Sequence, residues 1–284
     1  MPMVVNTNVI SMTAQRHLGI NTNMLNKSLE KLASGYRINR AGDDAAGLMI
    51  SETLRTQIRG SKKALDNVQD GLNMLNIADG AFQTIQDSLQ RIRELTVQSA
   101  NDTYATAQRT AINGEIEQLR ADITRIANSV MFNGVPLIAS TGAPTNFFLQ
   151  VGANSSAVND RIDIIGALGD TTAVTGLALT SAADVIINHS SAQNYISVID
   201  TSLSTLGSKR ATLGAMINRL EAAGANLGIA IENFSSSESR LRNVDVAAET
   251  AEMTRNQILQ QASATVLTQA NQVPQLALQL IRGQ

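Results

Sequence analysis

The stretch YISVIDTSLSTLGSKRATLGAMINRLEAAGANLGIAIENFSSSESRL, residues 195–241, decides the fold because one apolar position recurs in it every seven residues without exception. This spacing indicates a long helix with a narrow apolar stripe, which remains exposed to water unless partner helices cover it. The intermediate positions include Arg210, Gly224 and Glu238, which argue against a simple parallel dimer of this helix and favour packing against several different helices. The recurring core positions are Ile199, Leu206, Leu213, Leu220, Leu227, Phe234 and Leu241.

Two further helices are predicted upstream of this stretch. Residues 45–100 contain no proline, and their apolar residues lie mostly three or four apart, so we expect one continuous helix there. At ~1.5 Å per residue, such a helix would extend roughly 80 Å. A third helix follows over 112–130, where apolar residues alternate at intervals of four and three.

Shorter apolar stripes lie near both ends of the chain, and short β-prone segments at 146–151 and 161–165 lie between the long helices. This symmetric order predicts a mainly α fold: a long antiparallel helical rod or coiled coil of N- and C-terminal segments, with a small β-hairpin insert in the middle. We expect the insert to project from the far end. The terminal-helix positions expected to drive assembly are Leu18, Leu25, Leu29, Leu32, Leu259, Val266, Val273, Leu276 and Leu280.

The composition argues against several classes of function. The formal net charge is −2, which gives no basic field for nucleic acid, and the absence of Cys removes thiolate metal sites and Cys nucleophiles. Aromatic residues make up 3% and Trp is absent, a shortage that disfavours large enzyme pockets. No stretch approaches the roughly 18 apolar residues of a membrane span. We therefore expect no enzyme activity, cofactor, metal, nucleic acid or membrane insertion.

The ionisable residues with the strongest functional signal still favour structural roles. His17 and His189 are the only histidines, and neither lies in a zinc-binding His-Glu-x-x-His pattern. Asp43 and Asp44 immediately precede the long predicted helix. We expect this pair to cap that helix and to pair with the nearby Arg37 or Arg40, rather than to serve acid–base chemistry or a metal.

Several motifs, in order at both ends of the chain, resemble those of bacterial flagellins. The resemblance covers roughly 1–140 and 195–284 and leaves the middle of the chain unmatched. The motifs are NTN at 6–8, SLEKLASGYRIN at 28–39, DDAAGL at 43–48, QRIRELTVQSAN at 90–101, NRLE at 218–221, QILQQA at 257–262 and QANQVPQ at 269–275.

This resemblance implies a domain organisation. Residues 1–44 and 243–284 would form a terminal coiled-coil domain in the inner tube of a filament. Residues 45–142 and 192–242 would form a helical core domain in the outer tube, and 143–191 a short variable insert. A terminal stripe of a few turns cannot hold a helix alone in water, so we expect the two ends to fold together only as subunits polymerise.

The resemblance also implies a function and partners. The chain would be a secreted structural subunit that self-assembles into the extracellular filament of the bacterial flagellum and serves swimming motility. Its partners would be further copies of itself, the flagellar type III export apparatus, a chaperone at the C-terminal helix, and the filament cap and hook-junction proteins. Alternatives are a hook–filament junction protein, or a secreted adhesin or immune ligand in which polymerisation is secondary.

One surface is implied by the resemblance to take part in host recognition. Arg91 and Leu95 lie four residues apart on one predicted helix, and Glu115 lies on the next, a set similar to the flagellin surface read by a vertebrate Toll-like receptor. We expect contacts between protofilaments to be the main role of these residues and receptor binding to be secondary.

Overall fold

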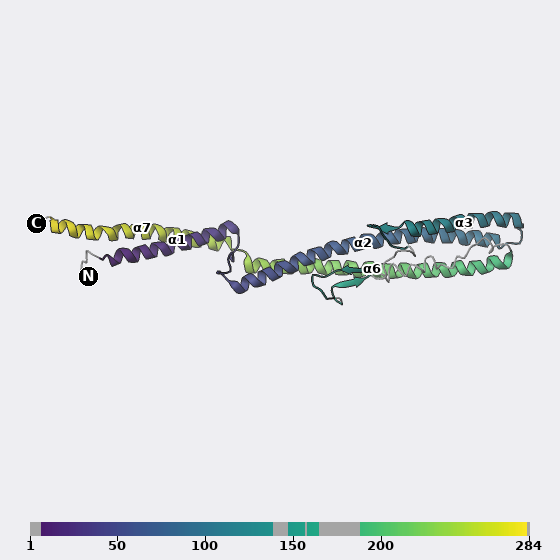
Figure 1. Cartoon of the computed structure of the whole chain (residues 1–284), viewed down its shortest axis with the longest axis horizontal. Coiled ribbons are helices and arrows are strands. Elements are labelled where there is room, and N and C mark those ends of the chain that lie inside the picture. The colour runs from purple at the N-terminus through teal and green to yellow at the C-terminus, as the bar shows by residue number, and fades with distance from the viewer. Residues whose placement is uncertain (1–6, 139–146, 157, 165–187, 283–284) are drawn as a thin grey trace. The chain divides into compact units, whose positions relative to one another are not determined.

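The computed structural model describes residues 7–138, 147–156, 158–164 and 188–282, with side chains described as far as residue 272. The chain divides into two compact units: unit 1, residues 1–56 and 233–284, and unit 2, residues 57–232. The fold is mainly α, as predicted (Figure 1). Its long helices are α1 (Val9–Ser34), α2 (Ala45–Ser99), α3 (Thr106–Ser129), α6 (His189–Arg242) and α7 (Val246–Arg282).

Local signals in the sequence set the ends of these helices. The Asn8 side chain accepts a hydrogen bond from the Ser11 backbone N–H at the start of α1. Helix α1 ends at Gly35, whose φ of 73° is a left-handed conformation that glycine adopts without steric cost. The Asp44 carboxylate accepts from the Gly47 N–H at 2.9 Å, so the prediction that an aspartate caps α2 is confirmed.

The core of unit 2 lies between α2, α3 and α6. Helices α2 and α6 run antiparallel in this unit, and Gly224 lets them approach closely: a Cβ there would lie 3.4 Å from Val68 Cγ1. Arg210, at the polar position of the α6 stripe, pairs with Asp79 on α2 at 3.0 Å. The α6 positions Ile199, Leu206, Leu213 and Leu220 are 0–1% exposed, whereas Leu227, Phe234 and Leu241 are half-buried.

A hairpin of strands β3 (Phe148–Gln150) and β4 (Arg161–Asp163) forms antiparallel, where the sequence predicts one. Its buried residues Val151, Ile162 and Ile164 belong to the core of unit 2. The prediction that it projects from the far end was wrong, because the hairpin packs along α2 at positions that lack side chains. A Cβ at Gly71 would lie 2.5 Å from Leu149, and one at Gly60 would lie 2.8 Å from the Cβ of Ala153. Residues 143–146 and 165–187 of the expected insert lie outside the described residues.

A second, smaller hairpin follows α3, where the sequence indicates only a turn. Strands β1 (Met131–Phe132) and β2 (Val135–Pro136) pair antiparallel across the two residues Asn133 and Gly134. Both of these residues have positive φ, 50° and 78°. Asn-Gly at a two-residue hairpin turn favours this conformation, because its handedness matches the twist of the strands.

Candidate interaction surface

Helices α1 and α7 of unit 1 pack side by side and antiparallel, joined largely by polar side chains. Asn8 Nδ2 donates to the Ala270 carbonyl at 2.8 Å, and Asn21 Nδ2 donates to Ser263 Oγ at 2.8 Å. Three further pairs continue this ladder, with Ser11 donating to Asn271, Gln260 donating to Thr22, and Lys31 paired with Glu249. From Ser11 to Lys31 the partner numbers fall along α7 as they rise along α1, so these bonds fix the register of the antiparallel pair.

The seam between α1 and α7 is made of small and polar residues. Among the residues of α1 and α7 whose side chains are described, the buried ones are Ser11, Ala14, Ser28, Asn256 and Ala270, each 3–7% exposed. Such side chains carry little apolar area, and hydrophobic stabilisation is roughly proportional to the apolar area removed from water. The seam therefore specifies a register more than it stabilises the pair.

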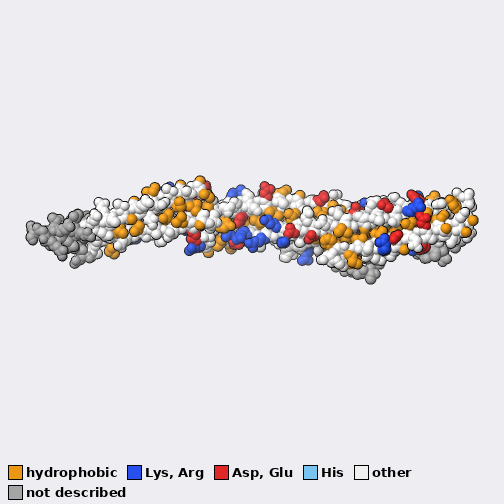
Figure 2. Space-filling view, turned by 90° about the horizontal axis from the view of Figure 1, so that it is seen from above, with side chains coloured by type: hydrophobic (Ala, Val, Ile, Leu, Met, Phe, Trp, Pro, Cys, Tyr) orange, Lys and Arg blue, Asp and Glu red, His pale blue; other side chains and the backbone are white. Residues whose placement is uncertain are grey.

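Many of the large apolar side chains of unit 1 point outward instead. Figure 2 shows hydrophobic side chains reaching the surface over the α1–α7 pair on the face in view. Met49, at 69%, and Val9, at 65%, are the most exposed of them. We call these residues the outer apolar set: Val9, Ile10, Met12, Ile20, Met24, Leu29, Met49, Ile50, Val246, Ile258, Leu259 and Val266.

Part of the outer apolar set borders a groove of about 580 Å³ along the α1–α7 pair. The α1 wall includes Val9 and Ile10, and the α7 wall includes Leu259 and Val266. His17 also lines this groove, beside Thr13, Ala14, Ala262 and Ser263. An apolar groove beside exposed aliphatic side chains is a surface suited to another helix, since burying both removes apolar area from water.

The assembly positions predicted from the sequence differ in exposure: some lie beside the α1–α7 seam and others on the outer surface of the pair. Leu18, Leu25 and Leu32 are half-buried beside α7, whereas Leu29, Leu259 and Val266 are exposed. The side chains of Val273, Leu276 and Leu280 lie outside those described. Sequence reasoning followed the leucines of α1 and missed its exposed apolar residues other than Leu29. Their signal was a second stripe on another face of the helix, with apolar residues at Val9, Ile20 and Met24.

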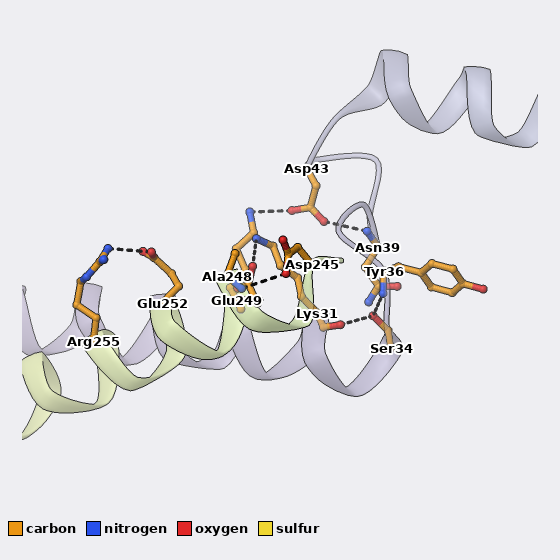
Figure 3. A network of polar contacts seen from close by, with 11 residues as sticks. Lys31, Ser34, Tyr36, Asn39, Asp43, Asp245, Ala248, Glu249, Glu252 and Arg255 are labelled. Atoms are coloured by element: carbon orange, nitrogen blue, oxygen red, sulfur yellow. Dashed lines mark hydrogen bonds and ion pairs between the residues drawn. The ribbon is translucent and has the colours of Figure 1, made fainter. Parts of the chain in front are cut away.

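The connector, defined as residues 35–44 and 243–245, joins the helices of unit 1 through polar contacts (Figure 3). Asp43 pairs with Lys27 of α1 at 2.7 Å and accepts from the backbone N–H groups of Asn39 and Arg40. The Lys27 hydrogen bond, followed by the Arg40 N–H, lowers the pKa of Asp43 from 3.8 to about 2. The predicted pairing with the Arg37 or Arg40 side chain was wrong, because the cation that pairs with Asp43 is Lys27 of α1.

A second contact holds the connector to the ends of α6 and α2 within unit 1. The Arg242 guanidinium lies 4.6 Å from the centre of the Tyr36 ring and donates to Glu52 at 2.7 Å. Tyr36 also forms an antiparallel bridge with Asn243. The Arg242 hydrogen bond, and after it that of Arg55, lowers the pKa of Glu52.

The residues expected at a receptor surface lie in unit 2. Arg91 of α2 pairs with Glu115 of α3 at 3.0 Å, and both side chains are about half exposed. The hydrogen bond to Glu115 is the main cause that raises the pKa of Arg91, with Glu94 adding to it. The prediction that Leu95 lies on this surface was wrong, because its side chain is 3% exposed and belongs to the core of unit 2.

The other ionisable candidates have structural surroundings. His189 Nδ1 lies 2.6 Å from the Ala100 carbonyl. Among the described residues, no group of three or more His, Asp or Glu side chains is placed to hold a metal ion. Over the same residues, no helix is both long and apolar enough to cross a bilayer.

Comparison with known proteins gives matches along most of the chain. The family described as "Bacterial flagellin N-terminal helical region" matches residues 5–143, and "Bacterial flagellin C-terminal helical region" matches residues 196–281. The flagellin of Halalkalibacterium halodurans is 46% identical over 284 residues, covering 99% of this chain and 100% of the relative.

Similarity extends to a second group of bacteria and to a solved structure. The flagellar filament 30.7 kDa core protein of Treponema maltophilum is 38% identical over 293 residues, covering 98% of this chain and 100% of the relative. The crystal structure of Bacillus cereus flagellin covers 57% of this chain and 88% of that chain, with 28% identity and a TM-score of 0.49.

Proposed function

Because this chain belongs to the bacterial flagellin family, we propose that its outer apolar set is the surface through which copies assemble into the flagellar filament. The chain is a structural subunit of that extracellular helical filament, which serves motility. The relatives are named flagellin and filament core protein, and these names do not favour a hook–filament junction protein or a secreted adhesin. We propose that the chain has no catalytic activity.

The single observation that carries the proposal is the arrangement of unit 1, with a seam of small and polar residues inside and many of its large apolar side chains outside. Burying one such side chain contributes about 1.5–3 kcal/mol, and the α1–α7 seam buries few of them. A second copy can supply that burial, so order in the helix pair depends on subunit concentration. Contacts between different surfaces of successive copies do not close on themselves and yield a helical polymer.

The division of the chain into unit 1 and unit 2 supports the domain organisation proposed from the sequence. We propose that residues 1–44 and 243–284 line the inner tube, and that 45–142 and 192–242 form the outer tube, with 143–191 as the insert. The two compact units place the boundary inside both long helices, after residue 56 of α2 and before residue 233 of α6. Contacts such as the Arg242–Glu52 pair account for that shift, since they tie the first turns of α2 to the connector.

Export and assembly partners are proposed on the same basis. The subunit would leave the cell unfolded through the flagellar type III apparatus, with a chaperone covering α7 until export. The exposed apolar residues of α7, Ile258, Leu259 and Val266, give such a chaperone its binding surface. At the growing end, the filament cap would receive the subunit, and hook-junction proteins would hold the first copies.

The test of the assembly surface is a matched pair of aspartate variants on α7. Val266→Asp places a carboxylate at the groove, whereas Gln261→Asp places the same charge at an exposed polar position of the same helix. Purified monomer is seeded with filament fragments, and the critical concentration is measured by sedimentation and electron microscopy. We expect Val266→Asp to raise it at least about tenfold, since the lost burial is about 1.5–3 kcal/mol, and Gln261→Asp to change it little. Equal critical concentrations for the two variants would show that the groove is not an assembly contact.

A receptor contact is proposed for the exposed Arg91–Glu115 pair of the free subunit, with Leu95 supporting it from the core. In a pull-down with the vertebrate Toll-like receptor, the Arg91→Ala variant should bind much less than wild type, and the Arg93→Ala variant should bind as well as wild type. Arg93 is a fitting control because it is similarly exposed and pairs with Asp200 of α6 instead. Binding of Arg91→Ala at the wild-type level removes this proposal.

A further inference from the structure

Three methionines of unit 1 are placed unlike those of a protein core. Met12, Met24 and Met49 are 58%, 50% and 69% exposed, and all three belong to the outer apolar set. Met74, in the core of unit 2, is 2% exposed, and Met131 on β1 is 53% exposed. The thioethers of Met12, Met24 and Met49 are therefore open to solvent before any partner covers them, whereas Met253 on α7 is half-buried.

Met24 lies in line with the groove on the α1–α7 pair. It follows Ile20 by four residues and His17 by seven, spacings that put all three on one face of α1. His17 lines the groove, and Ile20 is 42% exposed. A helix that covers this face of α1 would bury the Met24 side chain.

We propose that Met12, Met24 and Met49 are oxidation sites, and that their conversion to sulfoxide by hydrogen peroxide blocks incorporation of the free subunit into the filament. The proposal rests on the assembly role proposed above. Incorporation buries the three side chains, so a subunit within the filament resists the oxidant that inactivates a free one. Reduction of the sulfoxides restores assembly.

The chemistry is a two-electron oxygen transfer. The Met sulfur lone pair attacks one peroxide oxygen, an S–O bond forms, and the O–O bond breaks. The departing hydroxide takes the proton from the transferred oxygen and leaves as water. The sulfur is oxidised and peroxide is reduced, with no further reactant needed. The product turns a flexible apolar side chain into a polar one, which disrupts surfaces rich in methionine.

The consequence for assembly follows from the burial each side chain would lose. A sulfoxide must be desolvated to enter an apolar contact, whereas methionine gains from entering it. We therefore expect the critical concentration of monomer to rise about tenfold for each oxidised position that the filament buries. The α1–α7 hydrogen bonds, which involve no methionine, are left unchanged.

The test compares full-length wild type with a Met12→Leu/Met24→Leu/Met49→Leu variant, because Leu keeps the volume and apolar character and does not react with peroxide. Met131→Leu is the control, an exposed methionine of unit 2. Monomer is treated with peroxide, its sulfoxides are located by peptide mass spectrometry, and seeded polymerisation is measured. We expect oxidised wild type and oxidised Met131→Leu to lose assembly, oxidised triple variant to retain it, and methionine sulfoxide reductase to restore the wild type.

A second measurement does not depend on the variant folding. Peroxide footprinting of wild type should oxidise Met12, Met24 and Met49 in free subunits. Within filaments their oxidation rates should be at least about tenfold lower, since burial limits oxidation. Equal assembly of oxidised and untreated wild type, or equal oxidation rates in both states, overturns the inference. Untreated wild type that fails to polymerise would instead overturn the proposed function.

Discussion

Three glycines on α2 allow the packing of the β3–β4 hairpin to be tested by adding single methyl groups. At Gly80 an added Cβ meets no other atom within 4 Å, and the position is exposed. At Gly60 it would lie 2.8 Å from the Cβ of Ala153 and 3.3 Å from its Cα. Gly71 is intermediate, because its contact at 2.5 Å is with the end of the Leu149 side chain, which can rotate. The same Gly→Ala substitution should therefore have opposite effects along one helix.

The magnitudes follow from two competing terms. Ala in a helix interior is favoured over Gly by about 1 kcal/mol, so Gly80→Ala should raise the free energy of unfolding by about that amount. At Gly60 the same gain is offset by overpacking against backbone, which costs about 1–3 kcal/mol and displaces the hairpin. The expected net effect of Gly60→Ala is a loss of about 1 kcal/mol, and Gly71→Ala should fall between the two.

Urea unfolding of the monomer under non-polymerising conditions measures these differences. Trp is absent, so tyrosine fluorescence reports unfolding, with Tyr195 in the core of unit 2 contributing. Ala153→Gly in the Gly60→Ala background removes the methyl group that clashes, and should recover stability despite its own loop-entropy cost of about 0.5–1 kcal/mol. If Gly60→Ala is stabilised as much as Gly80→Ala, or if Ala153→Gly gives no recovery, the hairpin does not pack where the structure places it.

Two further predictions concern charged residues. Arg210→Ala should lower the free energy of unfolding by about 2 kcal/mol, because the half-buried guanidinium contacts three acceptor side chains of α2. Arg93→Ala should change it little, since that ion pair is exposed, and equal losses in urea unfolding would contradict this reasoning. The pKa of Asp43 falls from 3.8 to about 2 on folding, so its stabilisation of the connector is present above pH 3.8 and is lost as the pH falls through 2. The protection factors of the Asn39 and Arg40 amides, which are corrected for the intrinsic pH dependence of hydrogen exchange, should fall over that range, and also in Asp43→Asn at neutral pH. Unchanged protection in the variant would exclude the carboxylate as their anchor.

The elements of the fold that repeat locally could be predicted from the sequence. The seven-residue series of α6 marks its buried stripe in unit 2, and the absence of proline marks the length of α2. Asp44 at the start of α2 and Asn133–Gly134 in the β1–β2 turn act within a few residues of themselves, so their roles follow from residue type alone.

Features that depend on contacts distant in sequence could not be predicted. Gly60 and Gly71 read as weak points of a helix until the hairpin is known to lie against them. The ion pair of Asp43 with Lys27 requires the connector to return beside α1, which no local pattern indicates. In the same way, Leu95 has the spacing of a surface partner of Arg91, and only the packing of α3 shows that it is buried.

The arrangement of unit 1 divides two tasks that an ordinary coiled coil combines in one seam. Hydrogen bonds such as Asn21–Ser263 are directional, so they select one register of α1 against α7, yet each contributes only about 1 kcal/mol. The apolar side chains that would stabilise the pair, among them Ile20 and Leu259, are exposed. An apolar seam would let the pair fold in a single subunit and would leave a polar exterior with nothing to gain from a neighbour. The polar seam keeps that gain for assembly, and the pair acquires its full stability only from further copies.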